Sequence, residues 1–165
     1  MRERERIEHI PYNSWKYDGW IHATEGDVID YTWIERDIRE LSDRFNIVEV
    51  GYDPWSCTQT ALRIRDDIGI PVVPVRQSFM SLSEPTKEFE RLIVSRKLAH
   101  NGNACLTWQA NNVTIRHDPA GNIKPEKGSV HKQKIDGIIA SIIALSRASL
   151  SDGGSIYEED GLLVL

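Results

Sequence analysis

The chain has 165 residues, of which 40% are hydrophobic and 27% are charged, as in an ordinary globular domain with a packed core. Its net charge of -5 excludes a uniformly basic nucleic-acid-binding protein, so an acidic partner would have to bind a local patch. Cys57 and Cys105 form no CxxC pair, which argues against a zinc site or a disulfide framework and suits a reducing cytoplasm. No apolar run approaches the roughly 20 residues that cross a membrane, and the N-terminus lacks a signal-peptide core.

The first 46 residues predict one clear helix. Residues 1–20 are charged and then aromatic, which favours a loop, and WIHAT (20–24) favours a short strand. Residues 30–46 follow, with Asp30 as the expected N-cap. One helical stripe is formed by four apolar side chains, Ile34, Ile38, Leu41 and Phe45.

The middle of the chain alternates predicted strands and helices. Residues 47–52 (IVEVGY) favour a buried strand, residues 58–68 a helix ended by Gly69, and residues 70–75 (IPVVPV) a second strand. Two prolines place the second strand at a sheet edge or a strand end.

A third helix is predicted over residues 83–99, with Ser83 as its cap and Pro85 in its first turn. Its expected buried side is formed by Phe89, Leu92, Ile93 and Leu98.

The last third predicts an extended segment at 104–110, a β-hairpin over 111–125 with its turn at 118–121, and a helix over 130–148. Residues 151–165 are expected to form a C-terminal tail. Strands that alternate with helices indicate an α/β fold, a mixed sheet flanked by helices on both sides.

Asp53 follows the strand 47–52 and precedes Pro54. Ligands of α/β sheets gather beyond the carboxyl ends of the strands, which makes Asp53 a candidate ligand or catalytic residue. An Asp-Pro pair that merely ends a strand is the alternative, because such turns are common.

Asp136 lies in the largely apolar segment KIDGIIASIIAL. An unpaired carboxylate beside a buried helix face is costly, and a metal cation or a basic partner would relieve that cost. The alternative is that an aspartate at a helix N-terminus favours the helix dipole and needs no ligand.

The segment 124–134 concentrates basic side chains directly before Asp136, against one acid, Glu126. A site that binds a phosphodiester needs carboxylates to hold Mg²⁺ or Mn²⁺ and lysines to bind the phosphates, and this segment could supply the lysines. The alternative is that the segment is a solvated surface loop. The candidate phosphate-binding residues are Lys124, Lys127, Lys132, Lys134 and His131.

These residues and their surroundings resemble the C-terminal nuclease domain of the large terminase subunit of tailed phages. The resemblance covers IPYNSWKYDGWIHATEGDVIDYTWIERDI, VEVGYDPW, QSFMSLSEPTKEFERLI, LAHNGNACLTW, KPEKGSVHKQKIDGIIASIIALSRA and SIYEEDGLLVL, in this order. It implies an RNase H-like fold, with residues 1–150 forming the nuclease domain.

The resemblance implies a metal-dependent endonuclease that cuts double-stranded DNA during capsid filling in the bacterial cytoplasm. Asp53 matches the second and Asp136 the third of three acids that hold two divalent ions, Mg²⁺ or Mn²⁺. Lys127 matches a recurring lysine of the PxK segment. Expected partners are double-stranded DNA, the small terminase subunit and the portal, with no membrane.

The family's first acid lies on a strand upstream of IPYNSW, so we expect that strand and its aspartate, together with the ATPase domain, to be absent from this sequence. The sequence would then be a fragment, a truncated prophage gene or part of a split subunit. Glu49 lies about 13 Å along the strand from Asp53, too far to share a metal pair with it. Asp118 on the predicted hairpin turn is the better substitute for the missing acid, although its position already fits a turn.

Two other functions stay open. With two of three acids, the domain could be a catalytically silent prophage remnant that folds and binds DNA weakly through residues 124–134. A small-molecule-binding α/β domain is the third interpretation, although the sequence offers it no Gly-rich phosphate loop.

Overall fold

The structure, a computed structural model, describes residues 1–24, 26, 30–128, 133–150 and 163–164. It divides into two compact units, which we describe separately. Unit 1 comprises Met1–Ala23 with Leu82–Leu165, and unit 2 comprises Thr24–Ser81. Among the described residues, no helix has the length and apolar character needed to span a membrane.

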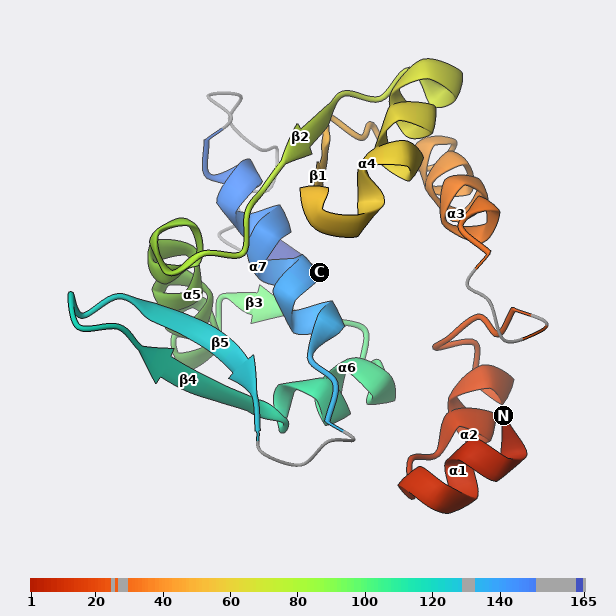
Figure 1. Cartoon of the computed structure of the whole chain (residues 1–165), viewed down its shortest axis with the longest axis horizontal. Coiled ribbons are helices and arrows are strands. Elements are labelled where there is room, and N and C mark those ends of the chain that lie inside the picture. Colours follow the sequence, from red (N-terminus) through yellow and green to blue (C-terminus); the bar gives the residue numbers. More distant parts are fainter. Residues whose placement is uncertain (25, 27–29, 129–132, 151–162, 165) are drawn as a thin grey trace. The chain divides into compact units, whose positions relative to one another are not determined.

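In unit 2, the described residues before Phe79 form a two-stranded parallel sheet and three helical segments (Figure 1). Strand β1 (Val50–Tyr52) pairs with β2 (Val72–Pro74), which confirms both predicted strands in shorter form. The helices are α3 (Thr32–Ser42), α4 (Pro54–Arg63) and its π-helical continuation η1 (Ile64–Ile68).

The predicted helix boundaries of unit 2 are partly confirmed. Tyr31 rather than Asp30 holds the N-cap position of α3, although the Asp30 side chain accepts a hydrogen bond from Thr32 N (3.0 Å), and α3 ends before Phe45. Gly69 ends η1 in the left-handed conformation (φ 83°), which confirms the predicted stop. Helix α4 begins at Pro54, earlier than predicted, because Asp53 caps it and proline suits the first helical position.

Unit 1 is built around two long helices, α5 (Phe79–Val94, whose first residues belong to unit 2) and α7 (Asp136–Ala148). Its other elements are α1 (Arg2–Glu8), α2 (Tyr12–Tyr17), β3 (Leu98–Ala99), α6 (Ala104–Ala110), β4 (Val113–His117), β5 (Ile123–Lys127) and β6 (Leu163–Val164). Figure 1 shows the β4–β5 hairpin beside α5. Strand β6 pairs with β3 in parallel, so the described strands form three two-stranded sheets rather than one mixed sheet.

The core of unit 1 joins α7 and α5. Helix α7 buries four residues, Ile138, Ile142, Ile143 and Leu145, and α5 buries Leu82, Phe89 and Leu92 among others. The hairpin is tied to this core by the buried Ser83, whose Oγ accepts a hydrogen bond from Ile123 N (3.1 Å).

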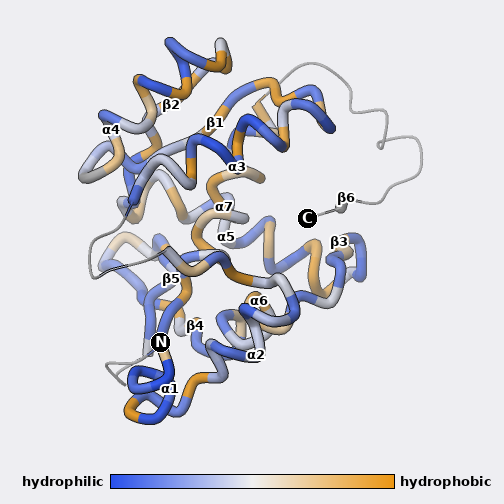
Figure 2. The backbone as a smooth tube through the Cα atoms, turned by 90° about the vertical axis from the view of Figure 1, so that its right-hand side faces the viewer, coloured by the Kyte–Doolittle hydropathy of each residue, from blue (hydrophilic) through white to orange (hydrophobic). Residues whose placement is uncertain are grey.

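The N-terminal predictions were wrong. Residues 1–20 form α1 and α2 rather than a loop, and residues 20–24 form no strand. Helix α1 has no buried residue and is drawn almost wholly blue in Figure 2, so it has no apolar stripe to reveal it. Trp15 anchors α2, because it is 5% exposed and its ring lies 5.4 Å from that of Trp108.

The segment 104–110 was predicted to be extended and is the helix α6. Its start is capped by Asn103, whose side chain accepts a hydrogen bond from Leu106 N (3.0 Å). The sequence NAC therefore contained a cap signal that its β-prone neighbours concealed.

Helix α5 starts earlier than predicted. Ser78 caps it through a hydrogen bond from Ser81 N (3.1 Å), so Ser83 is not the cap and Pro85 lies inside the helix. Leu98 belongs to β3 instead of the helix.

The predicted hairpin is confirmed, and the final helix is confirmed in shorter form. Residues 113–117 and 123–127 pair antiparallel, and the turn is closed by a hydrogen bond from Gly121 N to Asp118 O (3.0 Å). Helix α7 begins at Asp136, because the described residues 133–135 before it are not helical, and residues 130–132 of the predicted helix lie outside the described residues.

Candidate functional site

In unit 2, Asp53 lies directly beyond β1 and caps α4. Its Oδ1 accepts a hydrogen bond from Trp55 N (3.0 Å), and its Oδ2 accepts one from Gln77 Nε2 (2.7 Å). Asp53 is half-buried, and its side chain is therefore held through both oxygens while remaining accessible to solvent.

The parallel pairing of β1 and β2 explains why these side chains meet. Tyr52 is the register partner of Pro74, and Val75 N donates a hydrogen bond to Tyr52 O (2.7 Å). Residues that follow two paired parallel strands leave the sheet at the same edge, so Asp53 and Gln77 become neighbours. Our sequence interpretation missed Gln77, although the same strand-end argument that selected Asp53 applies to it.

Asp53 retains the capacity to bind a cation. A carboxylate offers about four acceptor positions, and two neutral N–H donors use only part of them. Within the described part of unit 2, Asp53 forms no ion pair that would neutralise its charge. Hard oxygen ligands of this kind suit Mg²⁺ and Mn²⁺.

In unit 1, Asp136 is the first residue of α7 and is exposed. Two carboxamide side chains fix the backbone around it. Asn112 Nδ2 donates to Lys134 O (3.1 Å), and Gln109 Oε1 accepts from Gly137 N (2.6 Å). Asp136 itself thus supplies no cap contact, and its carboxylate extends from a fixed backbone.

Gly137 allows α6 to approach this helix start. A Cβ atom at Gly137 would lie 3.0 Å from Leu106 Cδ1 and 3.1 Å from Gln109 Oε1. The absence of a side chain therefore keeps Gln109 within hydrogen-bonding distance of the helix N-terminus.

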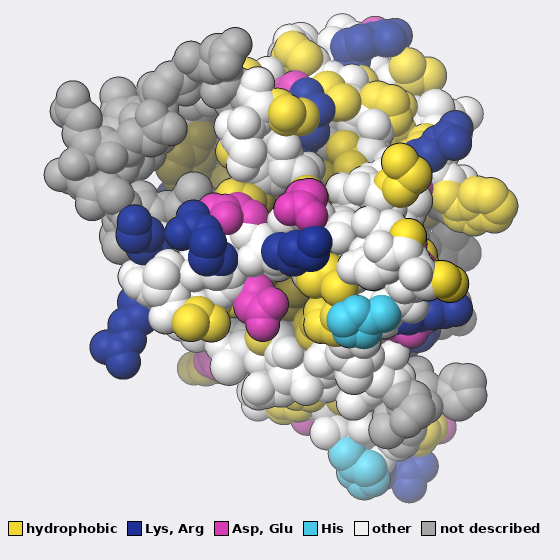
Figure 3. All heavy atoms as spheres, turned by 90° about the vertical axis from the view of Figure 1, so that its left-hand side faces the viewer, with side chains coloured by type: hydrophobic (Ala, Val, Ile, Leu, Met, Phe, Trp, Pro, Cys, Tyr) yellow, Lys and Arg dark blue, Asp and Glu magenta, His cyan; other side chains and the backbone are white. Residues whose placement is uncertain are grey.

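The predicted phosphate-binding residues do not all share one face of the hairpin. Lys124 pairs in register with Arg116, whereas Lys127 pairs with Val113, and side chains alternate between the two faces of a strand pair. Arg116 also forms an ion pair with Glu126 (3.4 Å). Figure 3 shows basic and acidic side chains interleaved on the face that it views.

Among the remaining basic candidates, Lys134 is exposed two residues before Asp136, and Lys127 is exposed at the end of β5. His131 and Lys132 lie outside the described residues.

Asp118 serves the hairpin turn, as the alternative interpretation expected. It accepts hydrogen bonds from Ala120 N (2.9 Å) and from Asn122 N and Nδ2 (both 2.8 Å), and the Asn122 side-chain bond is the main cause that lowers the pKa of Asp118. Glu49 precedes β1 instead of lying within it.

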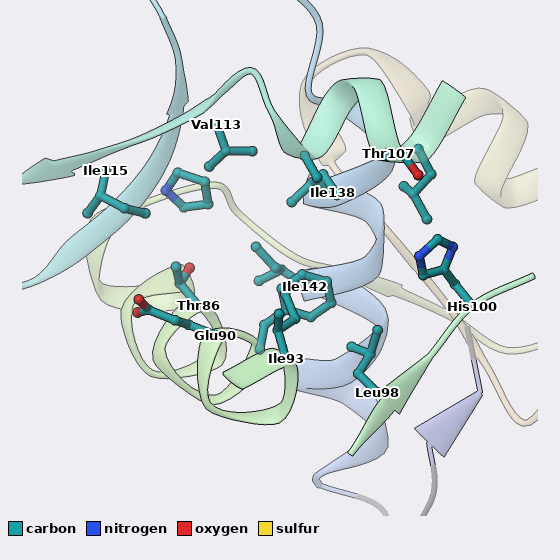
Figure 4. Close-up of a pocket in the computed structure, with 14 residues that line it drawn as sticks. Thr86, Glu90, Ile93, Leu98, His100, Thr107, Val113, Ile115, Ile138 and Ile142 are labelled. Carbon is teal, nitrogen blue, oxygen red and sulfur yellow. The ribbon is translucent and has the colours of Figure 1, made fainter. Parts of the chain in front are cut away.

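Unit 1 also contains an apolar cavity of about 500 Å³ between α5, α6, α7 and the hairpin (Figure 4). Ile138 and Ile142 line its middle, while Glu90 and His100 lie toward opposite ends. Among the predicted site residues that the structure describes, none lines this cavity.

Asp53 and Asp136 belong to different units, and their convergence on a common cation stays a prediction. In the part of the chain that the structure describes, no three His, Cys, Asp or Glu side chains are grouped to hold a metal ion.

Comparisons with known proteins agree with one another. The family model "Terminase large subunit, endonuclease domain" matches residues 2–152. The large terminase subunit of Enterobacteria phage HK97 is 28% identical over 98% of this chain and 31% of its own length. Protein YmfN of Escherichia coli K12 is 30% identical over 92% of this chain and 32% of its own length.

A crystal structure of the HK97 large terminase has a TM-score of 0.79 and 27% identity, over 88% of this chain and 30% of that chain. The match confirms the predicted α/β fold of the RNase H-like type. The chain therefore spans about a third of the length of these relatives. Because the family model extends over almost every residue, the chain belongs to the family of terminase large subunit endonuclease domains.

Proposed function

We propose that this chain is the divalent-metal-dependent endonuclease domain of a phage DNA-packaging terminase and cuts double-stranded DNA. Within the family assignment, the observation that carries the proposal is the placement of Asp53. Its carboxylate lies at the carboxyl edge of the β1–β2 sheet, is oriented by two neutral donors and keeps its negative charge available for a cation.

Asp53 and Asp136 would hold Mg²⁺ or Mn²⁺ through carboxylate oxygens. When bound, such ions activate a water nucleophile and stabilise the leaving oxygen of a phosphodiester. Lys127 and Lys134, both exposed, would bind backbone phosphates together with the other predicted residues, Lys124, Lys132 and His131. Phosphate contacts carry little base information, so cleavage without strong sequence preference is expected.

The proposal assigns residues 1–150 to the nuclease domain and residues 151–165 to a C-terminal tail. In a complete terminase this domain would work with an ATPase domain, the small subunit and the portal, in the cytoplasm of the bacterial host.

The test is nicking of a supercoiled plasmid in the presence of Mn²⁺. Asp53→Asn and Asp136→Asn should each lower the rate by more than the roughly 100-fold that outer-shell changes give. Asparagine retains an N-cap oxygen at position 53, so a loss of activity there would not reflect a lost cap.

Matched controls are Asp43→Asn in unit 2 and Asp18→Asn in unit 1, both at exposed positions. The controls should nick at the wild-type rate. Equal activity of the Asp53 and Asp136 variants and the wild type would refute the proposal.

A catalytically silent, weakly DNA-binding remnant is the second candidate. It is favoured by the lack of a three-residue metal group among the described side chains. Calorimetric titration with Mn²⁺ separates the two functions, because binding of two ions at micromolar concentration would exclude the silent domain.

A further inference from the structure

Gln77 is the second hydrogen-bond donor to the carboxylate of Asp53, beside Trp55 N. It follows β2, is exposed, and donates from Nε2 to Asp53 Oδ2 at 2.7 Å. The other oxygen of Asp53 is already occupied by the cap bond from Trp55 N. Gln77 therefore controls the one oxygen of Asp53 that helix capping leaves unrestrained.

A carboxylate held at one oxygen only can rotate about its Cβ–Cγ bond, whereas two donors from different elements fix its plane. The cap bond comes from α4, and the Gln77 bond comes from the segment after β2. Ligand carboxylates in metal sites are commonly oriented by such outer hydrogen bonds, whose removal typically costs about 10–100-fold in metal affinity or activity.

The donor is neutral, which matters for a residue that is to bind a cation. A cationic side chain at the same distance would form an ion pair with Asp53 and compete electrostatically with the metal. Arg76 is adjacent in sequence, yet the side chain that donates to Asp53 Oδ2 is the neutral amide of Gln77. The carboxylate is thereby oriented without being neutralised.

The bond contributes little to folding. Gln77 is exposed, and a solvent-accessible neutral hydrogen bond stabilises a protein by only about 0.5–1.5 kcal/mol. Its loss should leave the fold intact, so an effect on metal binding can be separated from an effect on stability.

We propose that Gln77 is a positioning residue that orients the Asp53 carboxylate for a divalent cation. The proposal rests on the proposed function, because it assumes that Asp53 binds the metal.

The experiment measures Mn²⁺ binding to the 165-residue chain by calorimetry, together with the thermal midpoint and plasmid nicking. Gln77→Leu removes the donor at similar volume. Its Mn²⁺ dissociation constant and the Mn²⁺ concentration for half-maximal nicking should both rise about 10-fold or more. The maximal rate at saturating Mn²⁺ should fall less than about 3-fold, because Asp53 itself remains.

Gln77→Arg keeps an N–H donor but adds a positive charge, and it should bind Mn²⁺ no better than Gln77→Leu. Gln59→Leu is the matched control, since Gln59 is an exposed glutamine on α4 of the same unit. The control should bind Mn²⁺ like the wild type, and all three variants should unfold within about 2 °C of it.

Wild-type Mn²⁺ affinity in Gln77→Leu would overturn the positioning role while leaving the proposed function intact. If Gln77→Leu bound Mn²⁺ more weakly and its thermal unfolding midpoint also fell by more than about 5 °C, Gln77 would act in folding, and the positioning role would likewise be overturned. A wild-type chain that neither binds Mn²⁺ nor nicks DNA would overturn the proposed function and this inference together.

Discussion

The two candidate metal ligands are presented in opposite ways. Asp53 is held by its side chain, with one hydrogen bond to each carboxylate oxygen. Asp136 is held by its backbone, because Asn112 and Gln109 bind the peptide groups on either side of it.

Because of this difference, a substitution of Asp53 affects folding as well as metal binding, whereas a substitution of Asp136 affects folding little. Asp53 starts a helix as well as facing a sheet edge, so a substitution there changes both stability and any metal site. Asp136 begins α7 without supplying a cap bond, so its side chain can change with little effect on folding. The following predictions test this contrast.

Ile142→Ala should have the largest effect, a loss of about 2–5 kcal/mol in unfolding free energy, because Ile142 lies on the buried side of α7 and is 2% exposed. Chemical denaturation measures the loss. Ile115→Ala, at a side chain that is 43% exposed, is the control and should cost less.

Hydrogen exchange in the same Ile142→Ala variant tests the division into units. Amides of α7 should exchange faster, while those of β1 and β2 should keep their protection. Equal acceleration in both units would show that Asp53 and Asp136 depend on one cooperative core.

Asn112→Ala should lower the unfolding free energy by about 1–3 kcal/mol, because Asn112 is 8% exposed and its amide is the donor to Lys134 O. Asn111→Ala, at the exposed neighbouring position, should be close to neutral. If both variants unfolded alike in urea, the backbone support of Asp136 would not depend on Asn112.

Asp53→Ala should cost about 1 kcal/mol through the lost cap, whereas Asp53→Asn should stay within a few tenths of the wild type. Asp136→Ala should cost no more than about 0.3–1 kcal/mol, the contribution of an acid at a helix N-terminus. Denaturation midpoints of the three variants provide the measurement. A larger loss of unfolding free energy in Asp136→Ala than in Asp53→Ala would contradict the difference between the two aspartates.

Asp118→Asn should have the smallest effect, and one that depends on pH. The folded-state pKa of Asp118 is lowered, chiefly by the Asn122 side chain, so its stabilisation is present above the unfolded-state pKa of about 4. That contribution disappears as the pH falls through the lower folded-state pKa. Thermal midpoints of wild type and variant should differ most at pH 7 and converge near pH 2, and a difference that grows in acid would contradict the assignment.

The elements recognised correctly from sequence are those whose signals are local. The Asp118 to Gly121 turn and the Gly69 stop follow from backbone preferences of a few residues. Helix α7 was recognised by its run of buried isoleucines, whereas its start was misjudged, because the contacts from Gln109 and Asn112 that fix it come from distant residues.

The missed N-terminal helices lacked such signals, whereas α6 had a cap signal at Asn103 that its β-prone neighbours concealed. Helices α1 and α2 are short, and α2 owes its place to the Trp15–Trp108 contact between residues far apart in sequence. In the candidate site, Asp53 could be selected from sequence because it ends an apolar run. The strand-end argument also applies to its partner Gln77, but the bond between the two side chains depends on the parallel pairing of β1 and β2, which the sequence does not specify residue by residue.

The observed cap role of Asp53 and its proposed role as a metal ligand together have an evolutionary consequence. A lineage that no longer needed to cut DNA could exchange this aspartate for asparagine, lose the charge and still begin α4 at the same residue. Asparagine at this position in a relative would therefore indicate a domain that has kept its fold but lost its nuclease activity. Alanine would indicate that neither the helix cap nor the metal ligand is still under selection.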